Sequence, residues 1–287
     1  MHQGYLHAQC MHMARRSGGD ATGEPLDSVR RMVHSADRAG AARALVSHEW
    51  ALATGGHLTD DEKKRVRAAI RRSYLDIGTG LARSLFHRAR VDPPSAPDSR
   101  LARTAEEAAA EQGPAIEGHG YRTWLAGSAL AQIDGVALDP ELFYVAGLLH
   151  DAGTLTEVLG QDFTIRSAEV CLDVCQRADV EDPSVATQLA DAVVAHTTPG
   201  LDPATDPLGF YVQSGAMADL AGLRLWDLPR HYLRRAYEAH PAHGVHQAIP
   251  PIIRKEAHDV PDGRFALLRR AGMDRMVTVS PTRRYAR

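Results

Sequence analysis

A repeated signal for the start of a helix limits most strongly what this chain can fold into. Asp139-Pro140, Asp182-Pro183 and Asp206-Pro207 each place an aspartate, a good N-cap residue, directly before a proline, which is well tolerated at the first helical position. Asp227-Leu228-Pro229 is a looser version of the same signal. No stretch of the sequence shows the strict period-two alternation of β-branched residues that is typical of a strand. The sequence therefore predicts an all-α protein with several helices of roughly 10 to 18 residues.

The order of linkers and helix signals divides the chain into four parts. Its 287 residues are enough for one large or two small domains. Three prolines between Val91 and Asp98 cannot continue a helix and indicate a linker. Before it, Thr59 and Glu62 fit a capping box at the start of a long amphipathic helix. We expect a flexible tail over 1–25, an N-terminal helical extension with its proline-rich linker over 26–96, a main domain over 97–272 and a C-terminal tail over 273–287.

Composition excludes several classes of function. The formal net charge of −3 gives no bulk electrostatic attraction to nucleic acid or to an anionic membrane. No apolar run approaches the roughly 18 to 20 residues that cross a bilayer, and no secretory signal is readable. Three cysteines are too few to staple a secreted domain. These features predict a cytoplasmic protein with no nucleic-acid or membrane partner.

His150 and Asp151 are the strongest candidates for chemistry. They follow directly on an apolar segment that begins at Pro140, so both polar side chains are expected at the end of a buried helix. Buried polar groups need partners, and a divalent cation would satisfy an imidazole and a carboxylate together. The pair therefore predicts a metal site.

Three further residues of ligand type lie in apolar helical settings. His119 is expected at the start of a helix, His196 at the end of another, and Asp219 on the apolar face of the next. Together with His150 and Asp151 they could close a four- or five-group cluster inside a helix bundle. Two plainer interpretations stay open: His196 could satisfy a backbone carbonyl at its helix end, and Asp219 could cap a helix or pair locally.

The stretch from about Pro97 to Gly272 resembles the HD-domain superfamily of metal-dependent hydrolases, whose ligand order is His … His-Asp … Asp. Within it, the chain is most similar to the cyanamide hydratase-like branch. Four elements carry the resemblance: His119-Gly120-Tyr121-Arg122, Leu148 to Thr154, His196 to Gly200, and Gly215 to Leu223. The resemblance implies an HD-domain helical bundle over 97–272. Gly120 departs from the serine that is usual there, and residues 1–90 have no counterpart in the branch.

The resemblance also implies a site. It gives His119, His150, Asp151 and Asp219 as metal ligands and Asp151 also as general base. His196 is implied as an additional ligand or as the group that handles protons, Arg122 as a substrate-orienting or supporting residue, and Thr154 and Thr197 as pocket residues. The cofactor it implies is one divalent metal ion, zinc in the first place, with iron or manganese as alternatives.

The function expected from this resemblance is that of a metal-dependent hydratase or hydrolase of a small nitrile- or cyanamide-like molecule, with metal-bound water as the nucleophile. Three alternatives stand beside it: an HD-type phosphohydrolase acting on a nucleotide or phosphate monoester, a di-iron HD-type oxygenase, and a non-catalytic HD interaction module. The N-terminal extension could also support a homo-oligomer.

Overall fold

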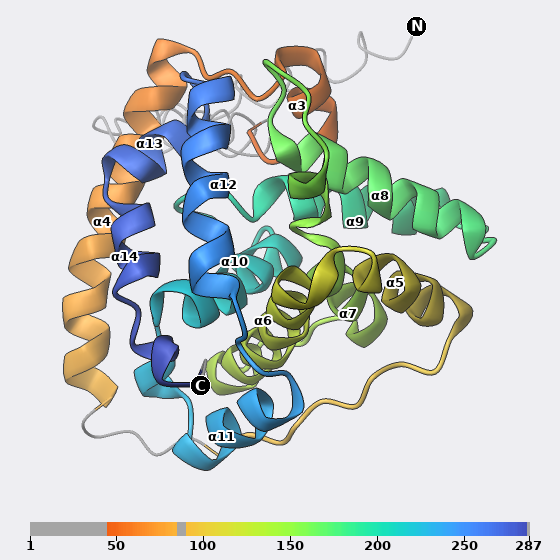
Figure 1. Ribbon diagram of the computed structural model, residues 1–287, viewed down its shortest axis with the longest axis vertical. Helices are drawn as coiled ribbons and strands as arrows, with labels where there is room; N and C mark the ends of the chain where they lie inside the picture. Colours follow the sequence, from red (N-terminus) through yellow and green to blue (C-terminus); the bar gives the residue numbers. More distant parts are fainter. Residues whose placement is uncertain (1–44, 85–89, 286–287) are drawn as a thin grey trace, which may run out of the picture. The chain divides into compact units, whose positions relative to one another are not determined.

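The computed structural model describes residues 45–84 and 90–285 of this chain, and within those ranges all regular secondary structure is helical (Figure 1). The all-α prediction is confirmed. The α-helices of this part are α3 (His48–Thr54), α4 (Asp60–Ser84), α5 (Arg100–Ala110), α6 (Gly113–Asp134), α7 (Pro140–Leu149), α8 (Phe163–Arg177), α9 (Pro183–Ala195), α10 (Pro207–Ala221), α11 (Arg230–Ala239), α12 (Val245–Asp259), α13 (Arg264–Arg270) and α14 (Met273–Thr278). Short 3₁₀ helices are η1 (Ala152–Leu155), η2 (Leu225–Asp227) and η3 (Pro281–Tyr285).

The Asp-Pro pairs begin helices as the sequence predicts. The carboxylates of Asp139, Asp182 and Asp206 accept backbone N–H groups at the starts of α7, α9 and α10. At the start of α4 the capping box is present, because the Thr59 backbone N–H donates to Glu62 at 2.7 Å and the Glu62 N–H donates to the Thr59 hydroxyl at 3.4 Å. The looser signal at Asp227 does not cap α11, whose N-cap is Pro229 with no side-chain hydrogen bond.

The core forms where α6 packs against α7 and α10. Its buried residues are supplied by these helices together with α5, α8, α9, α11, α12 and α14. α6 begins at Gly113 rather than at His119, so His119 lies inside the helix and not at its start. The early start follows from Pro114, which occupies the first turn without any side-chain cap to mark it.

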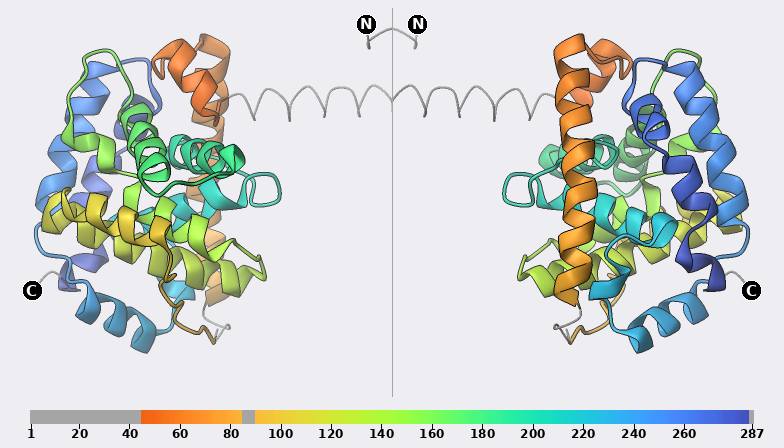
Figure 2. Two further views of the ribbon diagram at one scale, coloured as in Figure 1. Left: turned by 90° about the vertical axis from the view of Figure 1, so that its right-hand side faces the viewer. Right: turned by 90° about the vertical axis from the view of Figure 1, so that its left-hand side faces the viewer.

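α3 and α4 pack against helices from the second half of the chain. α3 contacts α8 and α9, and α4 contacts α13, where Leu45, Leu58 and Val66 form a small cluster with Leu267. The right-hand view of Figure 2 shows α4, in orange, as the helix nearest the viewer. The described residues, 45–84 and 90–285, belong to one compact unit. A domain boundary at 96/97 stays a prediction, and the predictions for residues 1–25 and 26–44 lie outside the described residues.

The C-terminal end of the chain differs from the expected tail. Residues 273–285 form α14 and η3, and Met273, Val277 and Thr282 are buried there. The sequence signal was weak, because α14 has six residues and its N-cap, Gly272, offers no side-chain cap.

Among the helices of the described ranges, none combines the length and the hydropathy of a membrane-spanning segment.

Candidate metal centre

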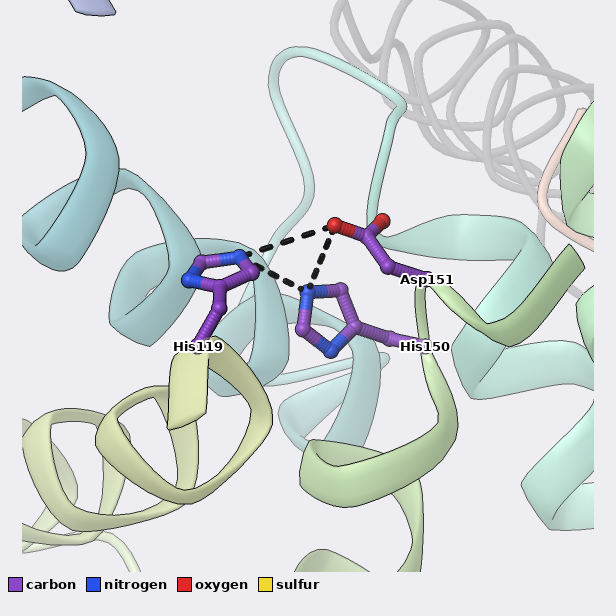
Figure 3. A group of neighbouring side chains, drawn as sticks. All are labelled: His119, His150 and Asp151. Carbon is purple, nitrogen blue, oxygen red and sulfur yellow. Dashed lines mark hydrogen bonds and ion pairs between the residues drawn. The ribbon is translucent and has the colours of Figure 1, made fainter. Parts of the chain in front are cut away.

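His119, His150 and Asp151 come together as a buried group that can hold a metal ion (Figure 3). The Nε2 atoms of the two histidines are 3.2 Å apart, and each lies about as far from Asp151 Oδ2, at 3.6 Å for His119 and 3.5 Å for His150. His119 comes from the interior of α6, while His150 and Asp151 follow directly on α7. Imidazole nitrogen and carboxylate oxygen are ordinary ligands of zinc, iron and manganese.

The close approach of α6 and α7 brings these side chains together. Gly120 lies next to His119, and a Cβ there would lie 2.9 Å from the carbonyl oxygen of Leu148. On the facing helix, a Cβ at Gly147 would lie 3.0 Å from Cβ of Trp124. The two helices can therefore cross at this distance because neither position carries a side chain. Gly120, the departure from the expected serine, leaves no room for a serine in this structure.

The hydrogen bonds of the histidine rings fix which nitrogen faces the group. His119 Nδ1 lies 2.7 Å from Asp219 Oδ2, His150 Nδ1 lies 2.9 Å from the Gly147 carbonyl, and His196 Nδ1 contacts the Val193 carbonyl. Carboxylate and carbonyl oxygens only accept, so each Nδ1 must donate. In their neutral forms the three rings therefore turn an unprotonated Nε2 towards Asp151. This is the second-sphere pattern that orients metal-binding histidines.

With the three rings in their neutral forms, the group consists of hydrogen-bond acceptors facing one another without a donor. Burial, with the His196 and His119 rings beside it, lowers the pKa of His150 to about 3 against the opposing pull of Asp151. A neutral His150 has no Nε2 proton to share with His119 near pH 7. Burying unpaired acceptors is costly, and a cation at this point would satisfy all of them. The residues present therefore fit a divalent metal ion.

Asp219 lies behind His119 and outside this group. Its carboxylate accepts from Arg122 Nε at 2.8 Å, from Arg122 Nη2 at 2.9 Å and from the Tyr237 hydroxyl at 2.7 Å, besides the bond from His119. Burial alone would raise the pKa of Asp219, but Arg122 and the His119 hydrogen bond lower it below its ordinary value. The local pairing left open by the sequence is present, and Asp219 orients His119 in this arrangement. Direct ligation by Asp219 stays a prediction.

The other expected site residues divide between the cavity and the surrounding structure. His196, the C-cap residue of α9, places its Nε2 3.6 Å from Asp151 Oδ1. The remaining donor of Arg122, Nη1, donates to the carbonyls of His240 and Pro241, and Arg122 does not line the cavity. The cavity has a volume of about 150 Å³, and its lining includes His119, His150, Asp151, Thr154, His196 and Thr197.

No protein-family model matches this chain, and no curated protein matches it. The HD-domain resemblance therefore rests on its four motifs, and the site rests on the geometry described above.

Three structural features of the site were not predicted from the sequence. Tyr237 in α11 supports Asp219, and the fully buried Arg264 donates to the Val194 carbonyl and the Thr198 hydroxyl on either side of His196. α4 also contributes Ile70, Ser73 and Tyr74 to the cavity. An arginine among apolar residues at 264–268 is the only sequence signal for any of these contacts.

Proposed function

We propose that this protein is a metal-dependent hydratase or hydrolase acting on an uncharged molecule with an electrophilic carbon, of the nitrile or cyanamide kind. The observation that carries the proposal is the convergence of Nε2 atoms on the Asp151 carboxylate, with each Nδ1 held by a protein oxygen. The motif resemblance to HD-domain hydrolases supports the same reaction class.

His119, His150 and Asp151 would hold the ion. A divalent cation there would supply Lewis acidity and lower the pKa of a coordinated water from about 15.7 towards 7. Asp151 has a second carboxylate oxygen, Oδ1, which faces His196 and is available to accept a proton. His196 donates its Nδ1 proton to the Val193 carbonyl, so Nε2 is the atom that can take a proton from the side of Asp151 and return it to a nitrogen of the substrate.

The cavity favours carbon over phosphorus as the reacting centre. Phosphate recognition draws on lysine or arginine, and the described lining includes neither. The described residues also contain one group with metal-ligand geometry rather than two adjacent ones, which favours a single ion over a di-iron centre. A phosphohydrolase and an oxygenase therefore have less support here.

Elemental analysis of the purified protein tests the proposal, with Asp151→Ala beside the wild type. His231→Ala on the exposed face of α11 is the matched control. We expect about one divalent ion per chain in the wild type and the control, and loss of the ion in Asp151→Ala. Turnover of a panel of nitriles, cyanamide and amides should follow the metal content.

Three results would contradict the proposal. Two irons per chain would favour the oxygenase. No metal under several expression conditions would favour the interaction module. Release of phosphate from phosphate monoesters, without turnover of any C–N substrate, would favour the phosphohydrolase.

A further inference from the structure

The ligand-type residues of the cavity and most of its apolar residues lie on different elements. The ligand-type residues come from α6, from the ends of α7 and α9, and from Asp151. The other walls are mainly apolar side chains of α10, α12, α13 and α14, among them Met217, Ile249, Ile253, Leu268, Met273 and Met276, with Gln213 of α10 as a polar neighbour of His196. The exposed residues of the lining, Ser73 and Tyr74, both belong to α4, so the cavity reaches the surface beside that helix.

The cavity is too large for a molecule of the size of cyanamide. A cavity needs about 10–15 Å³ to hold one water molecule. This cavity has about 150 Å³, which is room for a much larger molecule. A ligand of three heavy atoms at Asp151 would leave most of the apolar wall facing water or empty space. Three of the wall residues are methionines, whose flexible side chains adapt to apolar ligands of irregular shape. The walls therefore suit a substrate that brings an apolar body of its own.

The charges around the cavity disfavour an ionised body. Asp151 is the only carboxylate of the described lining, and that lining has no lysine or arginine to pair with an anion. Arg122, which lies behind His119, is already engaged by Asp219 and two carbonyls. A charge placed against these walls would lose its hydration without gaining a partner.

One hydroxyl at the polar end has no hydrogen-bond partner among the described residues. Thr197 lines the cavity next to His196, is only 4% exposed, and its Oγ1 is an orphan. Thr154, the other pocket threonine, already donates to the Asp151 carbonyl at 2.6 Å. Thr197 is therefore the side chain available to hydrogen-bond the reacting group of a ligand.

We propose that the substrate is an uncharged nitrile or amide carrying an alkyl or aryl body, with its reacting group between Asp151 and Thr197 and its body against α10, α12 and α14. The reacting group in this inference rests on the proposed function, whereas the apolar body is inferred from the cavity walls alone. Under this inference, the apolar walls determine which substrates bind.

Binding measurements can test the body separately from catalysis. We would titrate zinc-loaded protein with acetamide, butanamide, hexanamide and 6-aminohexanamide by calorimetry, recording the zinc content of every sample. Affinity should rise about fourfold per added methylene until the cavity is filled, which corresponds to about 0.8 kcal/mol each. 6-Aminohexanamide should bind no more tightly than acetamide, because its ammonium group would face the apolar wall.

Substitutions separate the two ends of the cavity. Met276→Lys on the half-buried wall of α14 should abolish the dependence on chain length, whereas Met276→Leu should keep it. Thr197→Val should weaken all neutral amides by a similar factor of about five. Equal affinity for acetamide and hexanamide, or tight binding of 6-aminohexanamide, would overturn the inference. A steep chain-length dependence in protein that holds no metal would support the apolar body and overturn the metal-dependent function, so the two failures are distinguishable.

Discussion

At the scale of single residues, the candidate metal centre depends on a carboxylate that lies behind it. Asp219 holds His119 in the tautomer that presents Nε2 and neutralises the buried guanidinium of Arg122. His150 and Asp151 could be predicted as a pair because they are consecutive at the end of an apolar helix. The Arg122–Asp219 contact could not, because the two residues are 97 positions apart and each offers several possible partners.

Replacing Asp219 with asparagine should therefore affect both metal affinity and stability. We expect metal affinity to fall about 10- to 100-fold, because the amide has one acceptor oxygen for donors that now bond two, and it has no charge to hold the Nδ1 proton of His119. The free energy of unfolding should fall by about 3–5 kcal/mol, since Arg122 keeps a buried charge without a counter-charge. Competition with a chelating dye and urea denaturation measure the two effects.

Tyr237→Phe is the control, because it removes one hydrogen bond to Asp219 and leaves the charge. This substitution should lower the free energy of unfolding by about 1 kcal/mol and leave the metal affinity nearly unchanged. A loss of metal affinity above a thousandfold in Asp219→Asn would indicate direct ligation by Asp219. Unchanged metal affinity would contradict the orienting role.

At the scale of helices, the site depends on how closely α6 and α7 cross. Helix starts at Pro140, Pro183 and Pro207 were predictable, because each has a capping aspartate whose chemistry is local. The crossing was not predictable, since it is decided by Gly120 and Gly147, which lie on different helices. A glycine inside a helix pattern usually costs stability, and the sequence alone does not show which backbone it allows to approach.

Gly120→Ala tests this contact. A Cβ there would press on the Leu148 backbone, so the two helices must separate by a few tenths of an ångström or more. We expect a loss of about 1–3 kcal/mol in the free energy of unfolding and at least a tenfold loss in metal affinity, because His119 moves relative to His150. Thermal unfolding with and without metal measures both.

The matched control is Gly135→Ala at the C-cap of the same helix. Gly135 has φ +72°, and a Cβ added there would meet nothing within 4 Å, so an alanine is strained by its backbone but crowds no neighbour. It should lose about 1–2 kcal/mol in stability while keeping its metal affinity. Equal effects of the two variants on metal affinity would mean that general destabilisation, and not the crossing, decides metal binding.

At the scale of the whole molecule, buried ion pairs join helices that are far apart in the sequence. Arg166 in α8 donates to Glu256 in α12 at 2.8 Å and to the Gly153 carbonyl, two residues after Asp151. Arg264 in α13 contacts Asp162 at 3.0 Å and the end of α9. The sequence predicted the helices but not these contacts, because which distant charges become partners depends on the packed arrangement of all the helices.

Titration of Glu256 in its pair with Arg166 makes the free energy of unfolding depend on pH. Burial, opposed by Arg166, raises the pKa of Glu256 from 4.5 to about 7. The folded protein then holds this proton more tightly than the unfolded chain, so the stability from Glu256 is complete below pH 4.5 and is lost as the pH rises to about 7. In metal-free protein, Glu256→Gln should therefore gain stability relative to the wild type across this range, by at most about 3 kcal/mol.

Comparing the two proteins at each pH cancels the contributions of the histidines, which are the same in both. Urea denaturation with a chelator present, at intervals from pH 4.5 to 8, gives the difference. Glu238→Gln on the exposed side of α11 should show no such trend. If the difference between Glu256→Gln and the wild type is constant over this range, Glu256 is ionised in its pair with Arg166 throughout. The Arg166–Glu256 contact would then join α8 to α12 as a full ion pair from about pH 4.5 to 8.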